Sequence, residues 1–315
     1  MKRRYRYLIH SVLILLALQT LLPFAFMVNN IFRSNSEFYH SFFSIPEAFK
    51  GMAQTTYRYV TFNDEPLEVE DPETGKKQSV ARSDAMGHYA GLSARGPRMA
   101  WRVLRPFMLN SFIVSLLTAA GVAFIGSTTA YVLARYRFIG SKAVFLTFLA
   151  TMMFPGVLTL VPSFLLVKHF GLLNSYAGMI LPYIAGGQVF AIFVFRSFFM
   201  GLPEELFESA RIDGAGHFAI YWHLIVPLSK PAFSVVIIMN LLGTWNNFLW
   251  PFIVNTDGSH HVVASGLYTM ATSQHASNFS TMYAAYAVSS LPMLVLFIYA
   301  TKPFIRGVTT GGLKA

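Results

Sequence analysis

Six long apolar runs constrain what this chain can fold into. Each has about 20 residues or more, enough to cross a hydrocarbon layer of about 30 Å as a helix. They lie at residues 8–28, 107–134, 143–168, 178–199, 232–253 and 283–303. Of the 315 residues 54% are hydrophobic and 12% charged, which leaves too little polar surface for an ordinary soluble domain. The runs therefore predict an all-α integral membrane protein with six transmembrane helices.

Two interpretations fit the first apolar run. Four basic residues between positions 2 and 6 precede it, as they would in a secretory signal peptide. Its apolar part, however, continues to about Val28, beyond the ~7–15 residues of a typical signal core, and no small-residue cleavage site follows. We expect residues 1–28 to form an N-terminal tail and a retained first transmembrane helix.

Basic residues in the short loops predict the orientation. The N-terminus, the 135–142 loop and the 304–315 tail carry Lys and Arg, whereas the loops at 169–177 and 255–282 carry none. Cytoplasmic loops are enriched in these residues, so both termini are expected in the cytoplasm of a multi-pass inner membrane protein. This placement accounts for most of the net charge of +10, and no nucleic-acid partner is needed to explain it.

Residues 29–106 form the one long stretch outside the predicted spans, and the topology places it on the extracytoplasmic side. Apolar and polar residues alternate on both sides of Asp71–Gly75, which predicts a β-hairpin. The acids there lack the ligand spacing of a calcium loop. His260, His261 and His275, in another loop, lack a helical i,i+4 pair, so we expect no metal site.

The segment from Glu204 to Pro227 is charged, unlike the apolar runs on either side of it. Pro203 and the acids after it suit the first turn of a helix, whose N-terminal end is positive. The buried face of that helix is expected to contain Leu206, Phe207 and Ala210. Glu208 is spaced to pair with Arg211 on another face.

Gly214 and Gly216 are expected to end this helix with a sharp turn. A second short helix should run from His217 to about Leu224, before Pro227. The resulting hairpin could lie on lipid, but such helices usually carry Lys and Arg on the polar face. Because this hairpin carries acids, which anionic lipid would repel, a docking element for a protein partner fits better.

The spacing within this segment resembles that of a known family. Glu208-Ser209-Ala210, three residues, Gly214, nine residues and Leu224-Ile225-Val226-Pro227 resemble the EAA loop of binding-protein-dependent ABC importers. Ser209, Leu224 and Val226 depart mildly from its pattern. The stretches "LNSFIVSLLTAAGVAFIGSTTAYVLARYRFIG" and "TWNNFLWPFIV" and the tail "IRGVTTGGLKA" resemble MalG-like carbohydrate permeases. The resemblance covers the first span and residues 105–315, and least of all the 29–106 insertion.

The resemblance implies a permease subunit with a five-helix core at 107–303 and a cytoplasmic coupling loop at 200–231. It implies a second, MalF-like permease, two ABC ATPase subunits that bind ATP and Mg, and an extracytoplasmic solute-binding protein that delivers a sugar. The chain itself would be no enzyme and would hold no cofactor. The residues expected to contact the ATPase are Glu204, Glu205, Leu206, Phe207, Glu208, Ser209, Ala210, Arg211, Asp213, Gly214, Ala215 and Gly216.

Polar side chains within the spans are candidates for the translocation path. They are Gln188, Asn240, Trp245, Asn246 and Asn247, since sugar hydroxyls need hydrogen bonds and sugar rings stack on aromatic rings. Such residues also join helices to one another, and that alternative stays open. In the outer 255–282 loop, the resemblance implies contact with the binding protein, for which Ser273, Gln274 and Ser277 are the candidates.

Another transport mechanism competes with this interpretation. An ion-coupled secondary transporter would need acids inside its spans, and none of the six predicted spans contains Asp or Glu. The substrate class is also open between neutral and acidic sugars. Arg102, Arg105 and Lys168, expected near the outer ends of spans, suit either an acidic oligosaccharide or lipid phosphates.

Overall fold

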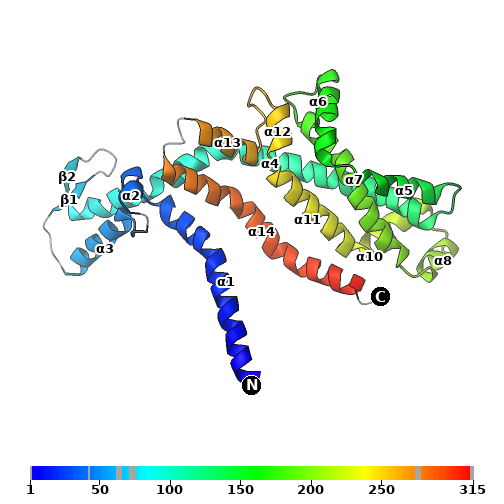
Figure 1. Cartoon of the computed structure of the whole chain (residues 1–315), viewed down its shortest axis with the longest axis horizontal. Helices are drawn as coiled ribbons and strands as arrows, with labels where there is room; N and C mark the ends of the chain where they lie inside the picture. Colours follow the sequence, from blue (N-terminus) through cyan, green and yellow to red (C-terminus); the bar gives the residue numbers. More distant parts are fainter. Residues whose placement is uncertain (1, 42, 62–65, 71–75, 274–277, 313–315) are drawn as a thin grey trace. The chain divides into compact units, whose positions relative to one another are not determined.

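The computed structural model of the chain describes residues 2–41, 43–61, 66–70, 76–273 and 278–312 (Figure 1). The chain forms two compact units. Unit 1 consists of residues 1–105 and 267–291, and unit 2 of residues 106–266 and 292–315. Two long helices, α4 (Arg82–Arg135) and α14 (Phe279–Gly312), contribute to both units.

Helices make up most of each unit. Unit 1 contains α1 (Lys2–Ile31), α2 (Asn35–His40), α3 (Glu47–Val60), β1 (Leu67–Glu70) and β2 (Lys77–Val80). Unit 2 contains α5 (Ser141–Thr151), η1 (Gly156–Thr159), α6 (Leu160–His169), α7 (Tyr176–Met200), α8 (Glu205–Ile212), α9 (His217–Ile220), η2 (Tyr221–Ile225), α10 (Val226–Leu228), α11 (Lys230–Asn246) and α12 (Leu249–Val254). Helix α13 (Val263–Thr272) begins in unit 2 and ends in unit 1.

Four helical stretches among the described residues are long and apolar enough to cross a membrane. They are Tyr7–Ile31, Ser83–Arg135, Tyr176–Met200 and Phe279–Ala300. Two sharply bent helix pairs, Ser141–Thr151 with Gly156–His169 and His217–Leu228 with Lys230–Asn246, raise the number to six if each pair is one span. The chain is therefore an all-α membrane protein. Helices α4 and α14 both extend beyond the spans predicted at 107–134 and 283–303.

The helix pair that covers the span predicted at 143–168 is sharply bent, in a segment where Pro155 and Pro162 favour a bend. Helix α5 ends at Thr151, and the chain turns by 92° before η1 and α6. Pro155 explains the break, because it has no N–H to donate and disfavours a helical conformation in the residue before it. Hydropathy alone does not reveal this bend, since the residues around it remain apolar.

The prediction of one helix at 232–253 is wrong. Helix α11 ends at Asn246, Asn247 adopts an extended conformation, and α12 begins at Leu249. The Asn247 side-chain oxygen accepts a hydrogen bond from the N–H of Trp250 at 3.1 Å. Asparagine is favoured in this helix-starting role, so Asn247 ends one helix and begins the next.

In unit 1, β1 and β2 pair antiparallel where alternation predicts a hairpin, with Leu67 opposite Val80. The connecting residues 71–75 lie outside the described residues. Leu67 and Val69 are buried and pack against Ala85 of α4. The alternation thus reflects one face packed on a helix and one face open to solvent.

The chain after α1 is held together by Arg33. Its guanidinium is buried and donates to the carbonyl oxygens of Glu37 and Ser41 and to the hydroxyl of Ser44. Ser34 and Glu37 form a capping box at the start of α2. These internal bonds satisfy a buried charge that would otherwise be costly.

In unit 2, small residues allow close packing of α4, α7 and α11. A Cβ added at Gly187 of α7 would lie 2.7 Å from Val122 of α4 and 2.8 Å from Asn240 of α11. A larger residue there would force these helices apart. The same three helices support a buried cluster that includes Phe195, Phe199 and Val236.

Candidate functional site

The charged hairpin, residues 203–228, joins α7 to α11 in unit 2. Its first arm is α8, and Gly214 turns the chain with a φ of +77°. The N–H of Gly214 donates to the carbonyl of Arg211, and that of Ala215 to the carbonyl of Ala210, at 3.0 and 2.9 Å. This is the helix-ending arrangement that favours glycine, so the sequence predicts the turn correctly.

The second arm is longer than the sequence predicts. Instead of ending near Leu224, it continues as α9, η2 and α10 to Leu228. The five residues of η2 form a π-helical turn, in which the N–H of Val226 donates to the carbonyl of Tyr221. Pro227 has no N–H, and the wider turn accommodates it inside the arm.

The inner face of α8 anchors the hairpin. Phe207 is buried in the cluster of α4, α7 and α11 side chains, and Ala210 packs against the same cluster. Leu206 was expected on this face, but its side chain is exposed. In an eight-residue helix the buried stripe is narrow, and Phe207 fills most of it.

The outer face of the hairpin combines acids with exposed apolar groups. Glu205, Glu208 and Asp213 are exposed, and Ile212 and Phe218 beside them are 85% and 75% exposed. These two apolar residues are not among the predicted contact residues. Helical periodicity could have found Ile212, because five positions from the buried Phe207 place it far from the inner face. Exposed apolar groups among charges are typical of surfaces that bind another protein.

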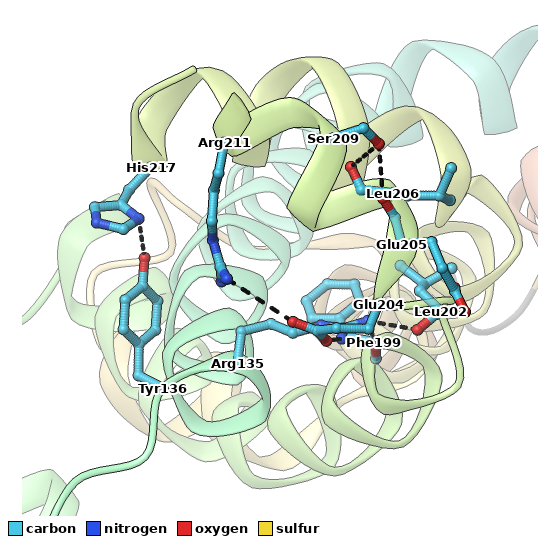
Figure 2. A network of polar contacts seen from close by, with 10 residues as sticks. All are labelled: Arg135, Tyr136, Phe199, Leu202, Glu204, Glu205, Leu206, Ser209, Arg211 and His217. Atoms are coloured by element: carbon cyan, nitrogen blue, oxygen red, sulfur yellow. Dashed lines mark hydrogen bonds and ion pairs between the residues drawn. The ribbon is translucent and has the colours of Figure 1, made fainter. Parts of the chain in front are cut away.

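Arg135, the last residue of α4, lies beneath the first arm (Figure 2). Its Nη1 donates to Oε2 of Glu204 at 2.6 Å, and its Nη2 donates to the carbonyls of Phe199 and Leu202 at 2.6 and 2.8 Å. The guanidinium carbon lies 3.8 Å from the centre of the Phe207 ring. In the sequence, Arg135 serves only as a topology signal, and nothing local in the sequence indicates this network.

The predicted pairing of Arg211 with Glu208 is wrong. Arg211 lies 4.0 Å from Glu204 instead, on the side where Arg135 already holds that carboxylate (Figure 2). Ser209 donates to the carbonyl of Glu205 in its own helix. Of the predicted docking residues, Glu204 is therefore engaged inside the chain, whereas Glu205, Glu208 and Asp213 face outward.

The candidate path residues make contacts within and between helices. Gln188 and Asn240 donate to carbonyls one turn back in their own helices, and their oxygens lie beside the close-packed Gly126 and Gly187. Trp245 is buried with its ring 5.1 Å from that of Phe112. The exposed Asn246 donates to its own helix, and Asn247 starts α12. The structure brings Gln188 and Asn240 to the same helix junction and leaves the other three at the end of α11.

Ser273 follows α13 and donates to the carbonyl of Met270 at 2.9 Å. Gln274 and Ser277 lie outside the described residues, as does His275. Among the described residues, no group of three or more His, Asp or Glu side chains could hold a metal ion.

A group of polar side chains joins helix and loop segments at the end of unit 2 that is remote from the charged hairpin. Asn110 of α4 accepts from the Tyr176 hydroxyl at 2.6 Å and donates to the carbonyl of His261 at 2.9 Å. Asn174 accepts from the N–H of Thr256 at 2.6 Å. Burial lowers the pKa of His261, so its imidazole is neutral at pH 7. We use the name neutral cluster for Asn110, Asn174, Tyr176, Thr256 and His261.

Comparison with known proteins identifies the family. Residues 126–310 match the model of the binding-protein-dependent transport system inner membrane component. The chain belongs to this family. The resemblance to permease subunits of such importers, drawn from the EAA-like spacing, is thereby confirmed, as is a place in the inner membrane.

Two relatives illustrate the extent of the match. The arabinooligosaccharides transport system permease protein AraQ of Bacillus subtilis is 36% identical over 66% of this chain and 73% of its own length. The diacetylchitobiose uptake system permease protein NgcG of Streptomyces coelicolor is 30% identical over 99% of this chain and 90% of its own length. The second match includes the 29–106 insertion, which the EAA-like spacing does not cover.

A solved structure shares the fold. One chain of a bacterial ABC transporter involved in the import of the acidic polysaccharide alginate superposes with a TM-score of 0.69. The alignment covers 96% of this chain and 97% of the other at 16% sequence identity. At that identity the likeness establishes the fold alone.

Proposed function

We propose that this family member is the permease subunit of an ATP-driven importer that carries an oligosaccharide across the cytoplasmic membrane by alternating access. The two relatives described above are transport permeases whose names specify oligosaccharide cargo. In this proposal the chain has six spans, two of them bent, with both termini in the cytoplasm and residues 29–106 outside. The basic residues of the 135–142 loop support this orientation.

The outer face of the charged hairpin carries the proposal. Two exposed apolar side chains stand among outward-facing acids, while Phe207 anchors the same helix in the core. We assign this face to an ATPase subunit. The sequence contains no phosphate-binding loop of the Walker type, so ATP and Mg would bind to the partner. Glu205, Glu208, Ile212, Asp213 and Phe218 are the contact residues we propose.

Three further roles complete the proposal. A second permease would pair with this chain, and a solute-binding protein would contact the 255–282 loop through Ser273, Gln274 and Ser277. Gln188, Asn240 and Trp245 are our path candidates, because polar groups in membrane helices usually face the bundle interior. Their bonds to their own helices also fit a packing role, so we expect the partner permease to supply other sugar contacts.

The test is to purify the complex from its native host through a tag on this chain. We expect an ATP-hydrolysing subunit and a binding protein to co-purify. Reconstituted liposomes should take up arabinotriose, diacetylchitobiose or a mannuronate trisaccharide only when ATP is hydrolysed. Uptake that persists with an inactive ATPase and follows a proton or sodium gradient would establish a secondary transporter instead.

The sugar panel also tests the charge of the substrate. Arg102, Arg105 and Lys168 are exposed, as both an acidic cargo and lipid phosphates would allow. If an acidic cargo is attracted by them, Arg102→Gln with Arg105→Gln should slow mannuronate uptake more than uptake of the neutral sugars, and added salt should reduce the difference. Equal effects on all three sugars would assign these residues to the lipid interface.

A further inference from the structure

We propose that Arg135 is a positioning residue that joins the charged hairpin to α4, so that movement of the hairpin reaches α4 as well as α7 and α11. This inference rests on the proposed function, in which the hairpin receives the movement of an ATPase. The chain itself connects the hairpin only to α7 and α11. Any transmission to α4 must therefore pass through side chains.

The two terminal nitrogens of Arg135 make this connection. One guanidinium bonds the last turn of α7 at Phe199, the connecting segment at Leu202 and the start of α8 at Glu204 (Figure 2). Three segments are thus held by a single residue that ends α4. A displacement of α8 relative to α4 would break the bond to Glu204, and a displacement of the end of α7 relative to α4 would break the bond to Phe199.

Burial makes such a displacement costly. The Arg135 side chain is only 8% exposed, whereas that of Glu204 is 53% exposed. A buried guanidinium that loses its partners pays a large desolvation cost, which an exposed ion pair does not. Phe207 covers one face of the guanidinium and is itself buried. The end of α4 and the start of α8 should therefore move as one body.

The second arm of the hairpin also contacts α4 and its extension. The Tyr136 hydroxyl hydrogen bonds Nδ1 of His217, the first residue of α9 (Figure 2). Two turns earlier in α4, Ser127 hydrogen bonds the Tyr221 hydroxyl at 2.6 Å in a buried position. Both arms are thus bonded to α4 or to the residue after it. Among these contacts, that of Arg135 with Glu204 is the ion pair.

Lysine cannot substitute for Arg135 in this role. An ammonium group could pair with Glu204, but it has no planar fork to reach two carbonyls as well, and it cannot stack flat on the Phe207 ring. Arg135→Lys therefore keeps the positive charge and removes the planar guanidinium that reaches Glu204, Phe199 and Leu202 together. Arg137, two residues on and exposed, offers the matched control Arg137→Lys.

The experiment measures uptake of a panel sugar and ATP hydrolysis together, in liposomes that contain the complete complex. We expect Arg135→Lys to assemble and hydrolyse ATP at a rate near that of the wild type, while sugar taken up per ATP falls about tenfold, the scale of a lost charged hydrogen bond. Arg137→Lys should keep the wild-type ratio. A wild-type ratio in Arg135→Lys, whether or not the total activity falls, would overturn the inference, because a merely structural role lowers both rates together.

A second variant guards against misfolding. Glu204→Gln keeps an oxygen acceptor for Arg135 and removes only the charge, so we expect a smaller fall in the ratio. Combined with Arg135→Lys, it should add little, because both changes act on one contact. Full additivity would contradict the inference. If the wild-type complex shows no ATP-dependent uptake, the proposed function fails instead, and this inference fails with it.

Discussion

The two ends of unit 2 are held by different chemistry. At the charged hairpin, one buried arginine holds three segments, and exposed carboxylates lie on the outer face of the hairpin. The other end of unit 2 lies near α6 and α12 (Figure 1). There the neutral cluster joins α4, α7 and the loop after α12 through amides and hydroxyls. Asn110 and His261 are buried there.

This difference in chemistry suits the charged hairpin to movement by a partner and suits the neutral cluster to holding its helices in place. Buried neutral bonds contribute about 0.5–1.5 kcal/mol each and are insensitive to salt. Exposed ion pairs contribute only about 0–1 kcal/mol, so the outward acids of the hairpin add little to the fold and remain available to a partner. We infer that the hairpin moves together with Arg135 and the end of α4, while the neutral cluster keeps the far ends of the helices together.

The largest expected effect comes from two matched glycines, one at each end. Gly214 and Gly171 both end a helix with positive φ, at +77° and +67°, and each N–H donates at 3.0 Å to the carbonyl three residues back. Proline cannot adopt that conformation or donate, so each Gly→Pro change should cost more than ~1 kcal/mol of stability. We expect only Gly214→Pro to abolish ATP-driven uptake in chains that still insert. Loss of uptake in both variants would remove the distinction between the ends.

The next effect concerns the exposed apolar side chains of the hairpin. Ile212→Ser combined with Phe218→Ser should weaken co-purification of the ATPase by at least about tenfold, since each loses ~1–2 kcal/mol of apolar burial in the complex. Ile139→Ser is the matched control, because Ile139 is exposed in the 135–142 loop but lies outside the hairpin. Equal losses from both changes would indicate a general effect of surface polarity.

A change in the neutral cluster should alter stability and leave ATPase binding unchanged. Asn110→Leu leaves the Tyr176 hydroxyl and the His261 carbonyl without their partner in a buried site, at ~1–3 kcal/mol for each group. Thermal unfolding in detergent should therefore begin at a lower temperature than in the wild type. Asn246→Leu, at an exposed site, is the control. Reduced ATPase co-purification with Asn110→Leu would show that the two ends are not independent.

The smallest effect concerns Asp257, beside the neutral cluster. The N–H and hydroxyl of Ser259 donate to its carboxylate and hold its pKa below the ordinary value. The stabilisation is complete above the ordinary aspartate pKa of about 3.9 and is lost as the pH falls through the lower folded-state pKa. Asp257→Asn should therefore differ slightly from the wild type in thermal unfolding at pH 7, and less in strongly acidic solution. A pH-independent difference would contradict this contribution of the carboxylate.

The sequence predicted the hairpin better than the network that holds it. Its acids and glycines lie close together in the chain, so helix-start and helix-end preferences suffice to place α8 and the Gly214 turn. Arg135 meets Glu204 across 69 positions of sequence, and such contacts leave no local pattern. Helical periodicity could have placed Ile212 away from the buried face, but its exposure also depends on Phe207 filling the core.

The membrane helices show the same limit. Apolar length predicted the four helical stretches among the described residues that are long enough to cross a membrane, because that signal depends on composition. The breaks at Pro155 and Asn247 depend instead on backbone hydrogen bonding, and hydropathy does not register it. Asn247 is one of the predicted path candidates, and the structure shows that its side-chain oxygen accepts the N–H of Trp250 at the start of α12.

The most direct test of the account places a photo-cross-linking amino acid at Ile212 and, separately, at Ile139, in membranes of the native host. We predict that the Ile212 position forms an adduct with one protein, and that mass spectrometry of the adduct identifies a chain with a phosphate-binding loop. The Ile139 position should form no such adduct. Adducts of Ile212 with lipid alone, or with the same proteins as Ile139, would contradict the claim that the charged hairpin is where an ATPase binds.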